Sequence, residues 1–173
     1  VCTPARAALL TGRFPTTTGI FMNDVPLLPE ERSIGKAFKT GGYDTAYIGK
    51  WHVDGHGRAS YIPPERRQGF DYWKVLECTH DYQNSEYYDS DDPDIKIWPG
   101  YDAFAQTEDA CTYINEHSEN PFFLVLSLGP PHFPHHNAPK EFQEMFSPEA
   151  ITFSPNVVFD DSKFEEFTRK EAA

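Results

Sequence analysis

The sequence predicts an α/β fold in which helices cover a largely parallel sheet. A long helix at residues 103–117 is followed by a short turn and the near-continuous apolar run of residues 122–128. A helix, a turn and a buried strand form half of a βαβ unit, and strands that are apolar on both faces are typical of parallel sheets. Gly129 and two prolines end this strand and place His132 in a loop at its C-terminal end, where open α/β sheets bind ligands.

The first element along the chain is a short helix within residues 3–12. Thr3 is expected to cap it, Pro4 suits its first turn, and Gly12 can end it in the left-handed conformation. Cys2 then comes immediately before the helix, and Arg6 lies one turn along it.

Further elements follow from turn residues and apolar patterns. A second helix is expected at residues 33–40, and a short strand at residues 43–48. Residues 55–102 are rich in Gly, Pro, Tyr and Asp, which predicts long surface loops with little regular structure. A last short helix is expected at residues 138–146.

The helix at residues 103–117 has an amphipathic pattern. Phe104, Thr107, Cys111 and Ile114 fall on one face, and the polar residues Gln106, Glu108, Asp109 and Glu116 lie largely off it. We therefore expect this apolar face to pack on the sheet.

Composition limits the possible functions. The 173 residues include 15 Lys and Arg, 27 Asp and Glu, and 39% hydrophobic residues, with a net charge of −12. The aromatic content of 15% argues against disorder, and the negative charge argues against binding to nucleic acid. No apolar run approaches the ~20 residues of a membrane span. The three cysteines lack a CxxC spacing, which disfavours a disulfide or zinc scaffold.

The charge is divided unevenly between the two halves of the chain. Residues 1–74 hold ten Lys and Arg against seven Asp and Glu, whereas residues 75–173 hold five against twenty. This asymmetry indicates that the first half handles an anion.

Two short groups of residues carry candidate chemistry in that basic half. The helix N-terminus beside Cys2 favours a bound anion, and Arg6 could add donors to an oxyanion. Lys50 and His52 follow the predicted strand and point to one side of the chain, with Trp51 on the other. The alternative for the first group is an inert cysteine and a surface arginine. For the second, it is a solvated lysine and a structural histidine.

Three stretches, at residues 2–13, 42–52 and 121–134, resemble type I sulfatases. The first, Cys-Thr-Pro-Ala-Arg, matches the Cys-x-Pro-x-Arg pattern that directs oxidation of the cysteine to formylglycine in that family. The resemblance implies an α/β, alkaline-phosphatase-like sheet covered by helices, incomplete in a fragment that begins at the active-site cysteine. Residues 1–150 would form the nucleophile side of the catalytic domain, and residues 151–173 a continuation or a frayed tail.

The resemblance also implies a role for five residues. A formylglycine-generating enzyme would oxidise Cys2, and one hydroxyl of the hydrated aldehyde would attack the sulfur while the other would later expel sulfate. Arg6 would hold the formylglycine in place. Lys50 would bind the sulfate, His52 would take the proton during sulfate release, and His132 would bind a sulfate oxygen and assist the leaving group.

The family's calcium-type cation is held by an Asp pair upstream of the cysteine, an Asp-Asn pair far downstream and the formylglycine oxygen. Only Cys2 can be matched to this set, so we expect the chain alone to be inactive. The Tyr- and Asp-rich loops at residues 72–102 resemble those of carbohydrate sulfatases, which favours a sulfated glycan over a small aryl sulfate. The family resemblance suggests a periplasmic or secreted protein.

Three alternative functions remain open. A phosphonate or phosphate monoester hydrolase could use the same scaffold and nucleophile, and an inactive module could retain the fold alone. A thiol hydrolase could pair Cys2 directly with His52 or His132, without oxidation or metal.

Overall fold

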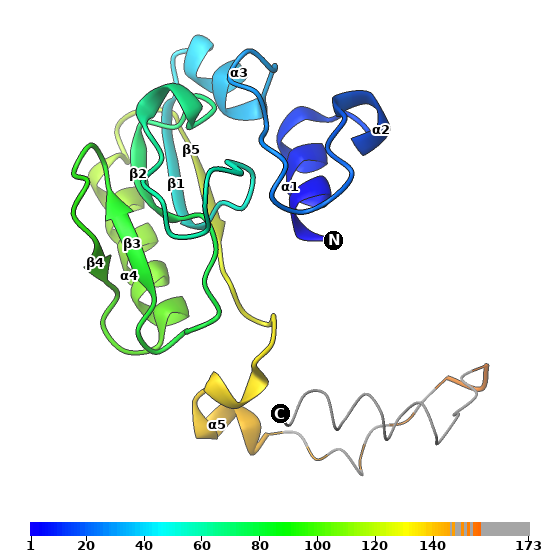
Figure 1. Ribbon diagram of the computed structural model, residues 1–173. Helices are drawn as coiled ribbons and strands as arrows, with labels where there is room; N and C mark the ends of the chain where they lie inside the picture. The colour runs from blue at the N-terminus through cyan, green and yellow to red at the C-terminus, as the bar shows by residue number, and fades with distance from the viewer. Residues whose placement is uncertain (146, 148–149, 151, 153, 157–173) are drawn as a thin grey trace. The chain divides into compact units, whose positions relative to one another are not determined.

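The computed structural model describes residues 1–145, 147, 150, 152 and 154–156. Its contacts divide the chain into two units, Val1–His132 and Phe133–Ala173. A five-stranded sheet of order β4-β3-β2-β1-β5 organises the first unit (Figure 1). Its strands are β1 (Asp44–Lys50), β2 (Tyr72–Leu76), β3 (Glu86–Asp89), β4 (Lys96–Ile97) and β5 (Phe122–Ser127).

Strand β1 pairs in parallel with β2 on one side and with β5 on the other. Gly49 is in register with Ser127, so the C-terminal ends of β1 and β5 lie side by side. Strands β3 and β4 extend the sheet in antiparallel pairs beyond β2. The predicted α/β sheet is therefore confirmed, and its central strand delivers Lys50 to the edge where ligands bind in such folds.

The two faces of the sheet pack against different parts of the chain, because successive side chains of β1 alternate. Tyr47 joins a core with Ala7 and Leu10 of α1 (Cys2–Thr11). Ile48 joins a core with Ala105 and Ala110 of α4 (Asp102–Glu116). Two further helices, α2 (Pro15–Thr18) and α3 (Ile34–Thr40), lie with α1 in the N-terminal part of this unit (Figure 1).

The region predicted as loops, residues 55–102, contains three strands and the 3₁₀ helix η1 (Pro64–Arg66), so that prediction was wrong. The three strands have two to five residues and are separated by polar segments that contain Asp and one Pro, which hides their short apolar runs. The buried Trp73 and Val75 of β2 join the core on the α1 side, and this core fixes the strand beside β1.

Helix α4 is present as predicted, but the prediction of which of its faces packs on the sheet was wrong. Phe104 and Ile114 are 47% and 42% exposed, and Ala105, Ala110 and Tyr113 are buried instead. Small alanines let the helix approach the sheet closely, and periodicity of large apolar residues does not reveal that contact.

Strand β5 forms where predicted, but all six of its residues are only half-buried, because it lies at the edge of the described sheet. The last predicted helix is shorter than expected, as α5 (Lys140–Gln143), and η2 (His135–Asn137) precedes it. Apart from residues 152 and 154–156, the segment 151–173 lies outside the described part of the chain. In that described part, no helix combines the length and apolar character needed to cross a membrane.

Candidate active site

The first turn of α1 presents Cys2, which is half-buried and is the first residue of the helix, with Val1 as N-cap. Thr3 therefore lies inside the helix and does not cap it, contrary to the prediction. The N–H of Thr3 donates to Oδ1 of Asn23 at 3.0 Å, so a residue outside the helix supplies the cap. Cys2 occupies the positive end of the helix, a position that favours an anion.

Arg6 joins this helix to the sheet. Its Nη1 donates to the backbone carbonyl of Lys50 at 2.7 Å and to Oγ of Ser127 at 2.7 Å. The same carbonyl accepts hydrogen bonds from the hydroxyls of Ser127 at 2.8 Å and Tyr47 at 3.0 Å. The described contacts of Arg6 therefore hold α1 against the ends of β1 and β5.

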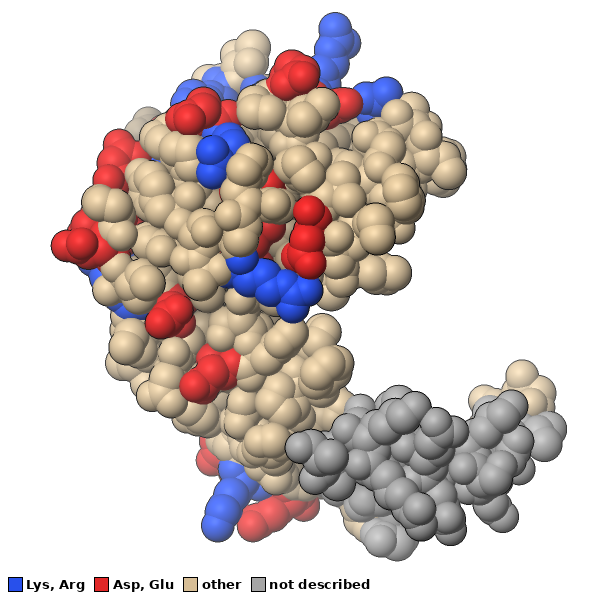
Figure 2. All heavy atoms as spheres, in the orientation of Figure 1, with Lys and Arg blue, Asp and Glu red and all other residues tan. Residues whose placement is uncertain are grey.

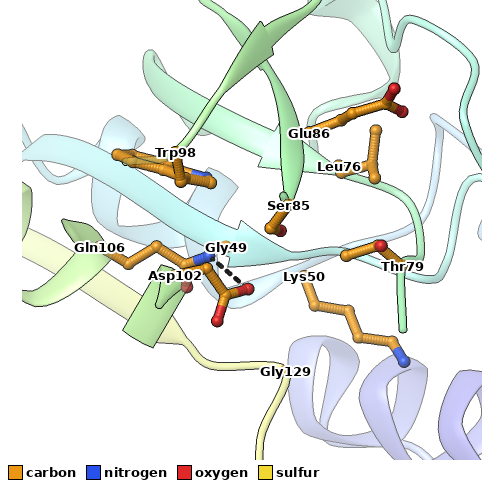
Figure 3. Close-up of a pocket in the computed structure, with 10 residues that line it drawn as sticks. All are labelled: Gly49, Lys50, Leu76, Thr79, Ser85, Glu86, Trp98, Asp102, Gln106 and Gly129. Atoms are coloured by element: carbon orange, nitrogen blue, oxygen red, sulfur yellow. Dashed lines mark hydrogen bonds between the residues drawn. The ribbon is translucent and has the colours of Figure 1, made fainter. Parts of the chain in front are cut away.

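Lys50 is 7% exposed at the end of β1, so the alternative of a solvated lysine is wrong. A small cavity lined by Gly49 and Lys50 has a volume of about 10 Å³, which is the space of one water molecule. Asp102 and Gln106 line it, and within the described part of the chain their buried Oδ1 and Oε1 atoms have no hydrogen-bond partner. Figure 3 shows the Lys50 ammonium directed away from Asp102. The cavity is too small for a sulfate, and the Lys50 ammonium does not point into it.

His52 is 3% exposed, and its Nε2 lies 3.3 Å from Oδ1 of Asp24. Burial and the nearby charge of Lys50 lower the pKa of His52 to about 4, and Asp24 opposes that shift. The imidazole is therefore neutral at neutral pH and able to accept a proton. Since an ionised carboxylate only accepts hydrogen bonds, Nε2 is assigned the hydrogen. The buried Nδ1, which has no hydrogen-bond partner among the described residues, keeps its lone pair.

Asp24 is a site residue that the sequence reasoning missed. Its carboxylate accepts hydrogen bonds from Nε of Arg58 at 3.3 Å and from Nη2 at 3.0 Å. These bonds lower the pKa of Asp24. Figure 2 shows acidic and basic side chains next to each other in the middle of the face viewed. No spacing in the sequence signals this pair, because the two residues lie 34 positions apart.

His132 follows β5 and stacks on His80, with ring centroids 4.7 Å apart and planes 20° from parallel. Burial lowers the pKa of His80, and the charges of Lys50 and His132 lower it further. His80 was also missed by the sequence reasoning. The charge of Lys50 thus lowers the pKa of both His52 and His80.

A second buried network supports the turn that follows His52. Oε1 of Glu77 accepts the backbone N–H groups of Asp54 at 2.9 Å and Gly55 at 3.0 Å. Burial raises the pKa of Glu77 to about 7. Asp54 itself accepts a hydrogen bond from Nε of Arg66 at 2.7 Å. These contacts hold the backbone next to His52 in one conformation.

The expected cation has few ligands in this part of the protein. Among the described residues, no group of three or more His, Cys, Asp and Glu side chains is arranged to hold a metal ion. A calcium ion needs 6–8 oxygen ligands, so position 2 alone does not make a site.

Comparison with known proteins decides the family. The family model for sulfatases matches residues 1–154. The chain belongs to the sulfatase family. The resemblance drawn from the three motif stretches is therefore confirmed.

Among curated sulfatases, an ulvan-active sulfatase of Formosa agariphila is 53% identical over 173 residues, which are 99% of this chain and 33% of that protein. An N-acetylglucosamine-6-O-sulfatase of Bacteroides thetaiotaomicron is 30% identical over 91% of this chain and 26% of that protein. The chain therefore spans about a third or less of the length of these relatives.

Two solved structures show the same fold. One from Bacteroides fragilis superposes with a TM-score of 0.85 at 25% identity, over 99% of this chain and 43% of that one. Another, in complex with its substrate D-glucosamine-2-N,6-O-disulfate, has a TM-score of 0.73 at 27% identity, over 93% of this chain and 31% of that one. These superpositions support the expected alkaline-phosphatase-like sheet, of which this chain supplies a part.

Proposed function

We propose that the whole protein hydrolyses a sulfate ester of a carbohydrate to an alcohol and inorganic sulfate. Residues 1–150 would form the nucleophile side of its catalytic domain, and residues 151–173 would continue it. The observation that carries the proposal is the Arg6 contact, which brings the helix of Cys2 against the strand end that bears Lys50. This arrangement puts a nucleophile position and a buried cation on the same edge of a parallel sheet.

Cys2 fits the proposed modification, because it is accessible at a helix N-terminus within a Cys-x-Pro-x-Arg pattern. Oxidised by a formylglycine-generating enzyme and hydrated, it supplies one hydroxyl that attacks the sulfur and a second that allows sulfate to leave. A divalent cation such as calcium belongs to the proposal, with position 2 as its contact in this chain.

The remaining residues of the site have complementary tasks. Lys50 stabilises the negative charge that develops on the sulfuryl oxygens. His52 is neutral and accepts the proton that must be lost when sulfate is expelled. His132 binds a sulfate oxygen and assists departure of the alcohol. Arg6 acts by holding the backbone of Lys50 in place.

A sulfated glycan is the substrate class that the relatives support. The named activities of the two curated sulfatases concern ulvan and N-acetylglucosamine-6-O-sulfate, and a solved relative holds a sulfated glucosamine. We therefore propose a sulfated carbohydrate, with ulvan oligosaccharides as the first substrates to try.

The test uses the full-length protein that contains this chain, expressed with a formylglycine-generating enzyme. Sulfate and phosphonate esters of one leaving group are assayed in parallel, together with ulvan oligosaccharides. We expect faster turnover of the sulfate ester, and release of sulfate from the oligosaccharides. Faster turnover of the phosphonate would instead support a phosphonate hydrolase. Activity that survives without the maturation enzyme would support a thiol hydrolase.

A further inference from the structure

A two-residue segment, Asn23-Asp24, connects the nucleophile helix with the candidate base. Oδ1 of Asn23 accepts the N–H of Thr3 at 3.0 Å. The backbone N–H of Asp24 donates to Oγ1 of Thr3 at 3.3 Å. Both bonds reach the residue next to Cys2, so the segment is fixed directly against the first turn of α1.

The side chain of Asp24 extends from this segment to two residues of another loop. Oδ1 lies 3.3 Å from Nε2 of His52, and Oδ2 accepts Nη2 of Arg58 at 3.0 Å. His52 is deeply buried, whereas Asp24 and Arg58 are 46% and 52% exposed. Arg58 therefore restrains the carboxylate of Asp24 through Oδ2, while Oδ1 of the same carboxylate faces the imidazole of His52.

The backbone around this contact is closely fitted. The N–H of Leu27 donates to the carbonyl of Val53 at 2.8 Å. A Cβ at Gly55 would lie 2.8 Å from the nitrogen of Pro26 and 2.9 Å from the carbonyl oxygen of Asp24, which leaves room only for glycine. The two loops thus pack backbone to backbone beside His52.

Both partners of the central contact have left-handed backbone conformations, with φ of 64° at Asp24 and 58° at His52. Residues other than glycine adopt this region at a cost in conformational energy, and such residues cluster at functional sites. The contacts between the two loops hold Asp24 and His52 in this conformation.

We propose that Asp24 is a positioning residue that orients the imidazole of His52 relative to the helix of Cys2. Its carboxylate accepts the Nε2 hydrogen, which fixes the tautomer of the imidazole and leaves the lone pair on the buried Nδ1. The inference rests on the proposed function for the role of His52 in sulfate release. The simpler alternative is a surface ion pair with Arg58, which would contribute little.

Kinetics of the full-length, matured protein separate these alternatives. Asp24→Ala should lower kcat by about 10–100-fold with little change in KM, as loss of an orienting partner does elsewhere. Asp24→Asn should retain most of the activity, because its amide oxygen can still accept the Nε2 hydrogen. The matched control is Asp71→Asn, which removes an exposed ion pair with Lys39 and should leave kcat unchanged. Equal kinetics for Asp24→Ala and the control would overturn the proposal.

A second measurement does not depend on turnover. Nitrogen-15 spectra of labelled histidine should show His52 with its hydrogen on Nε2 in the wild-type protein and in Asp24→Asn, and a mixture of tautomers in Asp24→Ala. A wild-type His52 with its hydrogen on Nδ1 would overturn the proposal, even if Asp24→Ala fails to fold. If the spectra are as expected but the protein has no sulfatase activity, the proposed function is contradicted, whereas the orienting contact between Asp24 and His52 is supported.

Discussion

Nη1 of Arg6 donates a 2.7 Å hydrogen bond to the backbone carbonyl of Lys50. This contact joins residues 44 positions apart and connects the helix that begins at Cys2 with the end of the central strand. The arginine of the Cys-x-Pro-x-Arg pattern thus has a structural task in the folded protein, besides any task in recognition by a maturation enzyme.

Arg6→Ala should reduce kcat/KM by roughly 100-fold, because a small displacement of the nucleophile from the Lys50 ammonium is enough for a loss of that size. Steady-state kinetics of the matured full-length protein measure the change. Arg13→Ala is the control, since Arg13 follows the same helix and forms an ion pair with Glu31. Similar kinetics for the two variants would contradict the importance of the contact.

Ser127→Ala should lower the free energy of unfolding by about 1–2 kcal/mol, because it removes a donor to the Lys50 carbonyl and an acceptor for Arg6. Denaturant titration gives the value. Ser60→Ala removes a solvent-exposed hydrogen bond from the Ser60 hydroxyl to the carbonyl of His56 and should have a smaller effect. If both variants lose the same free energy of unfolding, the half-buried hydrogen bonds of Ser127 contribute no more than an exposed one.

Lys50→Met should raise the pKa of His52 from about 4 toward its ordinary value of 6.5, because the charge of Lys50 is the second cause of the depression after burial. Titration of His52 by nuclear magnetic resonance follows the shift. Lys74→Met, which removes a lysine paired with Asp109, should leave the pKa of His52 unchanged. A value that stays near 4 in Lys50→Met would show that burial alone accounts for it.

Glu77→Gln should remove a pH dependence of stability. The pKa of Glu77 is about 7 in the folded protein against an ordinary 4.5, so the folded state binds a proton that the unfolded state releases between these values. Wild-type stability from this group therefore falls as pH rises through that window, by about 3 kcal/mol. Unfolding of Glu77→Gln measured at about pH 5 and pH 8 should lack this fall, and the exposed Glu65→Gln should retain it. An unchanged pH dependence in Glu77→Gln would contradict the assignment.

Local signals were enough to predict the elements that present the family residues. The helix after Cys2, the strand before Lys50 and the strand before His132 all formed, because caps, glycines and apolar runs act within a few residues. Strand β2 and the buried face of α4 were not predicted, since both depend on which distant surface is available for packing.

Two site residues, Asp24 and His80, were not predicted for the same reason: their contacts are with residues far away in the sequence. Asp24 gains its importance from His52 and Arg58, which lie 28 and 34 positions away, and nothing in its own neighbourhood indicates them. His80 likewise meets His132 only in the folded chain. The family motifs locate the reacting groups, whereas tertiary contacts determine the residues that hold them.

Mass spectrometry of the Cys2 peptide tests the account most directly. The full-length protein is expressed with a formylglycine-generating enzyme and digested, and the peptide containing the exposed Cys111 serves as an internal control. We predict the aldehyde at position 2 and an unchanged thiol at position 111. An unmodified thiol at Cys2 under these conditions would contradict the proposed mechanism.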